Sequence, residues 1–248
     1  MNITGDTILI TGGGTGIGRA LAEALHARGA QVIITGRRED VLKDTVAANP
    51  GMAWATLDVA DAEAIPAFAA RLVQDHPGLN AVIHNAGIMK IEDLTAQPFD
   101  LATVDATVAT NLLGPIRLTA ALLPHLQAQS TATIMTVTSG LAFVPLAATP
   151  TYNATKAGLH SWTESLRHQL RDTAIEVLEL APPGVATDLM PGHAENPAYM
   201  PLADYTAEVI GLIERGDTPR GEILVERVKP LRFAEANGYA AVFEMLNG

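Results

Sequence analysis

The stretch "TILITGGGTGIGRALAEAL" at residues 7–25 decides the fold. It begins with a short apolar run of the length of a buried strand and ends with the apolar spacing of an amphipathic helix. Between them stands T-G-x-x-x-G-x-G, with Gly12, Gly16 and Gly18 in the turn. Glycines let the backbone approach a pyrophosphate, and the N–H groups and dipole of a helix start favour its negative charge. We predict a nucleotide-binding strand–turn–helix unit; a turn that is glycine-rich for steric reasons alone is the alternative.

The same alternation of strand and helix continues along the chain. Short apolar runs recur, and amphipathic stretches such as "EAIPAFAARLVQDHPG" separate them. Parallel strands that helices cover on both faces read as such runs. No linker or internal repeat interrupts the pattern, so we predict one doubly wound, Rossmann-type α/β domain over residues 1–248, with a seven-stranded parallel sheet flanked by helices. The predicted strands are residues 7–11, 31–35, 53–57, 80–84, 132–137, 176–180 and 222–226.

The composition is that of a globular protein, with 48% hydrophobic and 17% charged residues. A net charge of −11 disfavours nonspecific binding to nucleic acid or to an anionic membrane. The absence of cysteine excludes disulfides and thiolate metal sites. The start "MNITGDTILI" lacks a signal-peptide pattern, and no apolar run reaches the roughly 18 residues of a membrane helix. We expect a cytoplasmic protein without a metal and without a nucleic-acid or membrane partner.

Further motifs follow the later strands. "HNAG" comes after the fourth strand, "TVTSG" places Ser139 after the fifth, and "TYNATKAG" provides Tyr152, thirteen residues beyond that serine, and Lys156. The last two side chains, at i and i+4, share one helix face. Together with the glycine turn and Asn111, this set resembles the short-chain dehydrogenase/reductase family. The resemblance is to its compact single-domain branch and covers about residues 5–226.

The resemblance implies a reaction in which hydride passes between nicotinamide C4 and a carbonyl carbon. Tyr152 would give or take the proton on oxygen, Ser139 would stabilise charge on that oxygen, and Lys156 would hold the nicotinamide ribose. A phenol of pKa about 10 exchanges protons poorly at neutral pH. We therefore expect the lysine ammonium and the positively charged nicotinamide ring to lower the pKa of the tyrosine. The implied catalytic set is Asn111, Ser139, Tyr152 and Lys156.

The implied cofactor is NADP(H), preferred over NAD(H). NAD-preferring relatives carry an acid at the position of Gly36, whereas here arginines follow a glycine, and Arg37 can grip a 2′-phosphate. Two solvated arginines at a helix start are the alternative. Asp58 resembles an adenine contact, or it caps the next helix. The implied cofactor contacts are Gly12, Thr15, Gly16, Ile17, Gly18, Arg37, Arg38, Asp58, Val59, Asn85, Ala86, Gly87, Tyr152, Lys156, Pro183, Gly184, Val185 and Thr187.

The longest irregular stretch follows the sixth strand, where open parallel sheets bind ligands. We predict a substrate lid over about residues 187–204, with a disordered insertion as the alternative. His193 in this lid is a candidate substrate contact, whereas His84, which departs from the family's N-N-A-G, is expected to be a hydrogen-bonded structural residue. The candidate walls lack a carboxylate clamp, which favours a hydrophobic ketone, aldehyde or alcohol, although each residue could be ordinary core. These walls are Leu141, Phe143, Leu146, Leu189, Met190 and Tyr199.

The long helix predicted at residues 99–127 contains "TNLLGP". Pro115 has no N–H to donate to the Asn111 carbonyl, and Gly114 adds slack. We predict a local break that frees this carbonyl to hold a water linking Lys156 to solvent. A packing kink without a role is the alternative.

The tail, about residues 227–248, has a basic turn and a further helical pattern where family tetramers often have a glycine-rich end. We therefore expect a homodimer through the helices that hold Asn111 and Tyr152, with a homotetramer as the alternative. Two rival functions stay open. One is an NADP-binding redox sensor, and the other is an isomerase or dehydratase that uses the same tyrosine.

Overall fold

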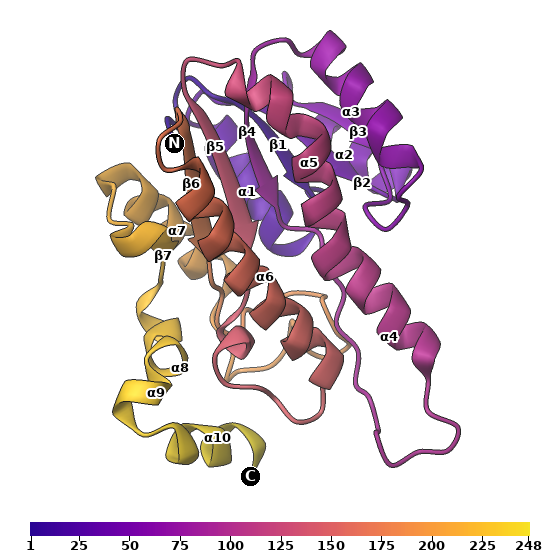
Figure 1. Cartoon of the computed structure of the whole chain (residues 1–248), viewed down its shortest axis with the longest axis vertical. Coiled ribbons are helices and arrows are strands. Elements are labelled where there is room, and N and C mark those ends of the chain that lie inside the picture. Colours follow the sequence, from indigo (N-terminus) through magenta and orange to yellow (C-terminus); the bar gives the residue numbers. More distant parts are fainter.

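A seven-stranded parallel sheet forms the centre of the computed structural model, which describes residues 1–248 (Figure 1). Neighbouring strands follow the order β3-β2-β1-β4-β5-β6-β7, so the chain starts in the middle of the sheet and winds outward in both directions. This order confirms the predicted doubly wound α/β fold. The strands are β1 (Thr7–Thr11), β2 (Gln31–Gly36), β3 (Ala53–Thr56), β4 (Leu79–His84), β5 (Ala132–Val137), β6 (Ile175–Leu180) and β7 (Glu222–Ile223).

The α-helices are α1 (Gly16–His26), α2 (Glu39–Ala48), α3 (Ala64–Asp75), α4 (Leu101–Val108), α5 (Gly114–Gln127), α6 (Pro150–Leu170), α7 (Leu202–Arg215), α8 (Lys229–Arg232), α9 (Ala234–Asn237) and α10 (Tyr239–Asn247). Successive residues of β1 point to opposite faces of the sheet. Ile8 and Ile10 belong to one core, which α1, α2 and α7 cover. Leu9 belongs to the other core, which α3, α5 and α6 cover. Apolar runs therefore form strands here because both of their faces are buried.

The last strand is shorter than predicted. β7 pairs with β6 only through Glu222 and Ile223, whereas the apolar run continues to residue 226. Leu224 and Val225 stay buried in the core but leave the hydrogen-bonded ladder, and a 3₁₀ turn follows them. The chain departs from the sheet edge at this point to build the tail helices α8–α10.

One helix runs without interruption from Leu101 to Gln127, through α4, a π-turn and α5. It begins after Asp100, whose carboxylate accepts the N–H groups of the first turn, slightly later than the predicted start at residue 99. The helix is long and apolar enough to cross a membrane by length and composition. However, its buried leucines, such as Leu118 and Leu122, pack against the sheet, which is the pattern of a core helix in a globular protein.

The loops after the carboxyl ends of the strands gather at one end of the sheet, at the bottom of Figure 1. The irregular segment 187–201 crosses this end, and α10 lies beneath it. Parallel α/β sheets bind ligands at this edge. The site described below occupies the same edge.

Candidate active site

A cavity of about 490 Å³ lies at the carboxyl ends of the strands. It extends from the glycine turn, past the end of β5, to the segment that follows β6. Most of the residues predicted from the sequence line this one space. They are Gly12, Thr15, Gly16, Ile17, Arg37, Arg38, Asp58, Val59, Asn85, Ala86, Gly87, Ser139, Leu141, Leu146, Tyr152, Lys156, Pro183, Gly184, Val185, Thr187, Leu189, His193 and Tyr199.

The glycine turn contains two residues in the left-handed backbone region, Gly12 at φ +67° and Gly16 at φ +53°. Gly18 does not line the cavity. A Cβ on it would lie 2.4 Å from the Gly12 carbonyl oxygen and 2.3 Å from the Asn85 amide nitrogen. That amide donates to the carbonyl oxygens of Thr11 (3.0 Å) and Gly12 (3.3 Å). Gly18 therefore allows α1 and the end of β4 to pack tightly around the turn.

Arginines with no acidic partner stand at the far end of the cavity. Arg37 and Arg38 are exposed, and neither forms an ion pair or a side-chain hydrogen bond. Asp58 accepts the backbone N–H of Ala60 (3.0 Å), whereas Asp61 caps the start of α3. The alternative that Asp58 caps this helix is therefore wrong.

Arg71 adds a positive charge that the sequence motifs do not indicate. It lies on α3 and shares a shallow depression with Arg37 and Asp58, next to the main cavity. No spacing rule connects a residue on the third helix with the end of β2, so only the fold brings these arginines together.

The long helix stays continuous at the predicted local break, where it forms a π-turn at Ala109–Leu113, closed by the N–H of Gly114 donating to the carbonyl of Ala109. Gly114 has ordinary helical angles (φ −55°, ψ −57°), so it does not provide the expected slack. A Cβ there would lie 2.8 Å from the carbonyl oxygen of Val59. Glycine is needed because the helix packs directly against the loop after β3.

Asn111 is fully buried behind the cavity and does not line it. Its side-chain oxygen accepts the N–H of Ile88 (2.9 Å), and its amide donates to the Ile88 carbonyl (2.8 Å). The same amide donates to the Thr155 hydroxyl at 3.3 Å. The asparagine side chain therefore ties the loop after β4 to α6, next to the buried lysine at position 156.

Ser139, Tyr152 and Lys156 are all buried at the cavity wall, each less than 10% exposed. Ser139 caps a 3₁₀ turn, because its hydroxyl oxygen accepts the N–H of Leu141 at 3.1 Å. The Lys156 ammonium lies 5.6 Å from the centroid of the Tyr152 ring and donates to the Val137 carbonyl at 2.7 Å.

Burial controls the protonation of this pair. It raises the pKa of Tyr152 to about 12, against a smaller lowering by the hydrogen bond with Ser139. It also lowers the pKa of Lys156 to about 8. The expected lowering of the tyrosine pKa is therefore absent from the protein alone, because burial disfavours the phenolate more than its neighbours favour it. At neutral pH the structure holds a neutral phenol beside an ammonium group.

His84 is the structural residue that its position predicts. It is 2% exposed, and its Nε2 atom lies 2.8 Å from the hydroxyl oxygen of Thr119 on α5. Burial lowers its pKa to about 3, so the ring is neutral. It takes no part in lining the cavity.

The segment predicted to be a lid is a loop whose base is closed by backbone pairing. Its two ends meet at a bridge between Val185 and Met200, where Met200 donates to the carbonyl of Gly184 at 2.8 Å. The ring of Tyr199 packs on Gly184, and His193 meets that ring edge-on at a centroid distance of 4.8 Å. The loop gives way to α7 at Leu202, a little before the predicted end of the lid.

Two predicted walls, Phe143 and Met190, do not line the cavity. The ring of Phe143 instead packs against His160, at a centroid distance of 4.9 Å, and under the guanidinium of Arg232, at 4.7 Å. Other residues take their place along the wall, and the sequence motifs indicate none of them. These additional lining residues include Ile88, Met89, Lys90, Leu231 and Leu246.

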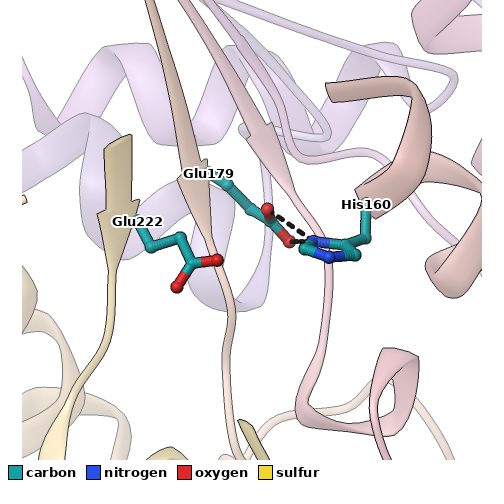
Figure 2. Close-up of side chains that lie close together, drawn as sticks. All are labelled: His160, Glu179 and Glu222. Carbon is teal, nitrogen blue, oxygen red and sulfur yellow. Dashed lines mark hydrogen bonds and ion pairs between the residues drawn. The ribbon is translucent and has the colours of Figure 1, made fainter. Parts of the chain in front are cut away.

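Figure 2 shows His160, Glu179 and Glu222, a group whose ligand atoms lie within 4.8 Å of one another. Glu179 and Glu222 are register partners on β6 and β7. His160 Nδ1 lies 2.8 Å from the Glu179 carboxylate, whose hydrogen bond raises the histidine pKa, and Arg232 binds Glu222 at 2.7 Å. Glu222 thus has a guanidinium partner, and Glu179 has a histidine that is a cation when protonated, so the group forms an ionic network around the start of the tail.

Comparison with known proteins finds a common pattern. A family model described as short chain dehydrogenase matches residues 6–198. The uncharacterized oxidoreductase DltE of Bacillus subtilis is 39% identical over 251 residues, which cover 100% of this chain and 98% of that protein. The uncharacterized oxidoreductase SA2266 of Staphylococcus aureus is 29% identical over 79% of this chain and 84% of its own length.

Solved structures show the same fold. A Burkholderia cenocepacia short chain dehydrogenase in complex with NADP has a TM-score of 0.84 at 24% identity, with 99% of both chains covered. A Streptomyces avermitilis short-chain dehydrogenase has a TM-score of 0.81 at 26% identity, covering 97% of this chain and 96% of its own. A Burkholderia phymatum relative in complex with NAD scores 0.80 at 21% identity, covering 100% and 97%.

Proposed function

Since this chain belongs to the short-chain dehydrogenase family, and is therefore an oxidoreductase, we propose that it interconverts a ketone or aldehyde and an alcohol with NADP(H). The observation that supports this most strongly is the convergence of Ser139, Tyr152 and Lys156 on one cavity whose other end is the glycine turn. These residues come from two elements, the loop after β5 and helix α6. A cavity that joins them to the turn can hold a dinucleotide and a small substrate side by side.

The residues at the turn fit a dinucleotide. Gly12, Gly14 and Gly16 line the cavity without side chains, and two of them have the left-handed backbone that brings N–H groups close to a bound anion. When bound, the dinucleotide supplies or accepts hydride at nicotinamide C4. Lys156 sits where its ammonium can bind the ribose hydroxyls, in exchange for its hydrogen bond to the Val137 carbonyl.

In the direction of reduction, Tyr152 donates its phenolic proton to the carbonyl oxygen as hydride reaches the carbonyl carbon. Its pKa of about 12 keeps the proton in place at neutral pH, and the adjacent ammonium stabilises the phenolate that results. Ser139 donates a hydrogen bond to the same oxygen in exchange for its hydrogen bond with Tyr152, while its own oxygen keeps accepting the N–H of Leu141. Asn111 positions the wall, since it holds Ile88 from behind.

Preference for NADP(H) over NAD(H) is supported by the charge around the end of β2. No acid stands at Gly36, and Arg37, Arg38 and Arg71 are all exposed at or beside the cavity. A 2′-phosphate would find donors there, whereas a carboxylate would repel it. The apolar walls Leu141, Leu146 and Leu189 favour a hydrophobic substrate.

The test is oxidation of NADPH with a panel of aromatic and aliphatic ketones, by wild type and Tyr152→Phe. We expect the variant to lose turnover by several orders of magnitude because it has no proton to transfer, while NADPH binding stays within about twofold. Turnover at the wild-type rate in Tyr152→Phe would overturn the proposal.

The two rival functions give different results in the same assay. A redox sensor would bind NADPH without turning over any ketone, although the complete serine, tyrosine and lysine set disfavours this. An isomerase or dehydratase would convert its substrate without a net change in NADPH absorbance.

We further propose that the protein acts in the cytoplasm as a homodimer that pairs through the two helices holding Asn111 and Tyr152, which are the long helix of α4 and α5 and the helix α6. Sedimentation at micromolar concentration tests this assembly. A monomer, or the homotetramer, would contradict it.

A further inference from the structure

The C-terminal segment 229–248, which comprises α8, α9 and α10, reaches back to the cavity. Leu231 on α8 and Leu246 on α10 both line it. Both leucines are half-buried although they lie on short helices at the chain end. In Figure 1 the chain descends through α8 and α9 at the lower left, and α10 runs below the loops at the carboxyl end of the sheet.

The first anchor of this segment lies next to the catalytic serine. A Cβ on Gly140 would come within 2.6 Å of Leu231 Cδ1 and within 3.0 Å of Val228. The leucine side chain thus occupies the space that any larger residue after Ser139 would need. The tail therefore packs directly against the backbone of the loop that carries Ser139.

The second anchor is ionic. Arg232 binds Glu222 through two nitrogen atoms, Nε at 3.1 Å and Nη2 at 2.7 Å, and its guanidinium covers the ring of Phe143. Glu222 is only 4% exposed, so this carboxylate depends on the arginine for a counter-charge. The pairing fixes the residue that follows Leu231 in the chain.

The third anchor holds the other end. The Asn247 side chain accepts the N–H of Ala147 at 2.5 Å and donates to the carbonyl of Pro145 at 3.1 Å. These bonds fasten α10 across the segment that carries Leu141 and Leu146. They place Leu246 at the cavity, whereas the adjacent Met245 is 72% exposed to solvent.

We propose that segment 229–248 is the specificity-determining wall of the site, where Leu231 and Leu246 contact an extended apolar substituent of the carbonyl substrate. The inference rests on the proposed carbonyl–alcohol reaction and names the substrate class: ketones or secondary alcohols with a long alkyl or an aryl substituent. A short substituent does not reach these leucines and gains nothing from them.

The test compares Leu246→Ala with Met245→Ala, its matched control on the same helix, using 2-nonanone and 2-butanone with NADPH. We expect Leu246→Ala to lower kcat/KM for 2-nonanone roughly tenfold and to leave 2-butanone unchanged, because a few methylene contacts are worth this much discrimination. The control should change neither value. Equal losses on both ketones, or no loss on either, would overturn the inference, and Leu231→Ala repeats the test if the first variant misfolds.

A binding measurement separates this inference from the proposed reaction. Nonanamide and acetamide are carbonyl compounds that hydride does not reduce. Calorimetric titration of the NADPH complex with these amides therefore measures how strongly the wall binds an alkyl chain, without turnover. We expect nonanamide to bind wild type and Met245→Ala more tightly than acetamide, and Leu246→Ala to lose this preference. Failure of every ketone with retained amide preference would reject the reaction alone, whereas absence of a preference in wild type would reject the wall.

Discussion

Arg37 and Arg38 point their charges into solvent with no carboxylate to neutralise them, at the end of the cavity beyond the glycine turn. An arginine fork binds a phosphate through charge-assisted hydrogen bonds, each worth about 1.5–3 kcal/mol. We predict that Arg37→Ala raises the KM for NADPH by about tenfold or more and leaves the KM for NADH nearly unchanged. Steady-state kinetics with both cofactors measures this, and Arg171→Ala, an exposed arginine outside the cavity, serves as control. Equal effects on NADPH and NADH would contradict the 2′-phosphate contact.

Residue identities at the site could be predicted, but their protonation could not. The pattern at Tyr152 and Lys156 places both side chains on one helix face. Their pKa values of about 12 and about 8 follow from burial, which depends on everything that packs around the pair. For the same reason the prediction that Phe143 lines the substrate pocket was wrong. Its apolar character suits a pocket wall, yet its ring lies between His160 and Arg232. Both of these residues are far from Phe143 in the chain.

Among the elements, the helix that carries Asn111 was predicted with its defect in the right place and with an incomplete cause. Pro115 removes a donor, as expected, and the structure adds a π-turn and a close contact between Gly114 and the Val59 carbonyl. A π-turn spans one more residue than an α-turn, and a sequence pattern does not distinguish it from a simple kink. The contact with the loop after β3 joins segments that are far apart in the chain.

We predict that Pro115→Ala restores an α-helical hydrogen bond to the Asn111 carbonyl and slows proton transfer. The pH–rate profile of ketone reduction should shift, and the Kd for NADPH should stay within about twofold. Pro124→Ala is the matched control, because Pro124 also lies inside α5 but away from the π-turn that holds Asn111. An unaltered profile in Pro115→Ala would leave the break with a packing role only.

A second prediction at the scale of elements concerns the contact between α8 and the loop that carries Ser139 and Gly140. Gly140→Ala places a methyl group 2.6 Å from Leu231 Cδ1 and should destabilise the fold by about 1–3 kcal/mol through overpacking. In the double variant with Leu231→Ala the methyl group has room, so part of that loss should return. Chemical denaturation of the four proteins gives the coupling energy. Additive losses would show that α8 does not press on Gly140 in solution.

At the scale of the whole molecule, the ionic network of His160, Glu179, Glu222 and Arg232 joins α6, the sheet edge and the tail. Hydrogen bonding to Glu179 is the largest of the effects that raise the pKa of His160 above 6.5, and burial opposes it more than Arg232 does. The folded state therefore binds more protons than the unfolded state just above this value. The stability that His160 contributes is fully present below pH 6.5 and is lost as the pH rises through the pKa of His160 in the folded state.

We predict that the midpoint of thermal unfolding falls as pH rises through this window, and that His160→Gln removes the part of the fall that the histidine causes. His168→Gln, an exposed histidine on the same helix, should keep the wild-type dependence. Scanning calorimetry across pH values above and below 6.5 measures both variants. A wild-type dependence retained in His160→Gln would assign it to another group.

The overall architecture was the most predictable level. Buried parallel strands leave a strong apolar signal, so six of the seven strands were placed within a residue at either end. The length of the seventh strand was overestimated. Leu224 and Val225 are apolar because they are buried in the core, but they do not pair with the neighbouring strand. The return of the tail to the cavity left no signal, since nothing in a short amphipathic pattern states what its apolar face will meet.

The C-terminal tail lies outside the part of the chain that the family model matches. The matched family segment ends at residue 198, thirty-one residues before α8 begins at residue 229. Of the residues in the proposed reaction, Ser139, Tyr152 and Lys156 lie inside this matched segment, whereas Leu231 and Leu246 of the proposed wall lie outside it. On this proposal, Leu141, Leu146 and Leu189 share a stretch of the chain with the proton donor, and the part of the substrate wall that the tail adds is encoded separately. Exchanging the last twenty residues between members could retarget the enzyme while its reaction stays the same.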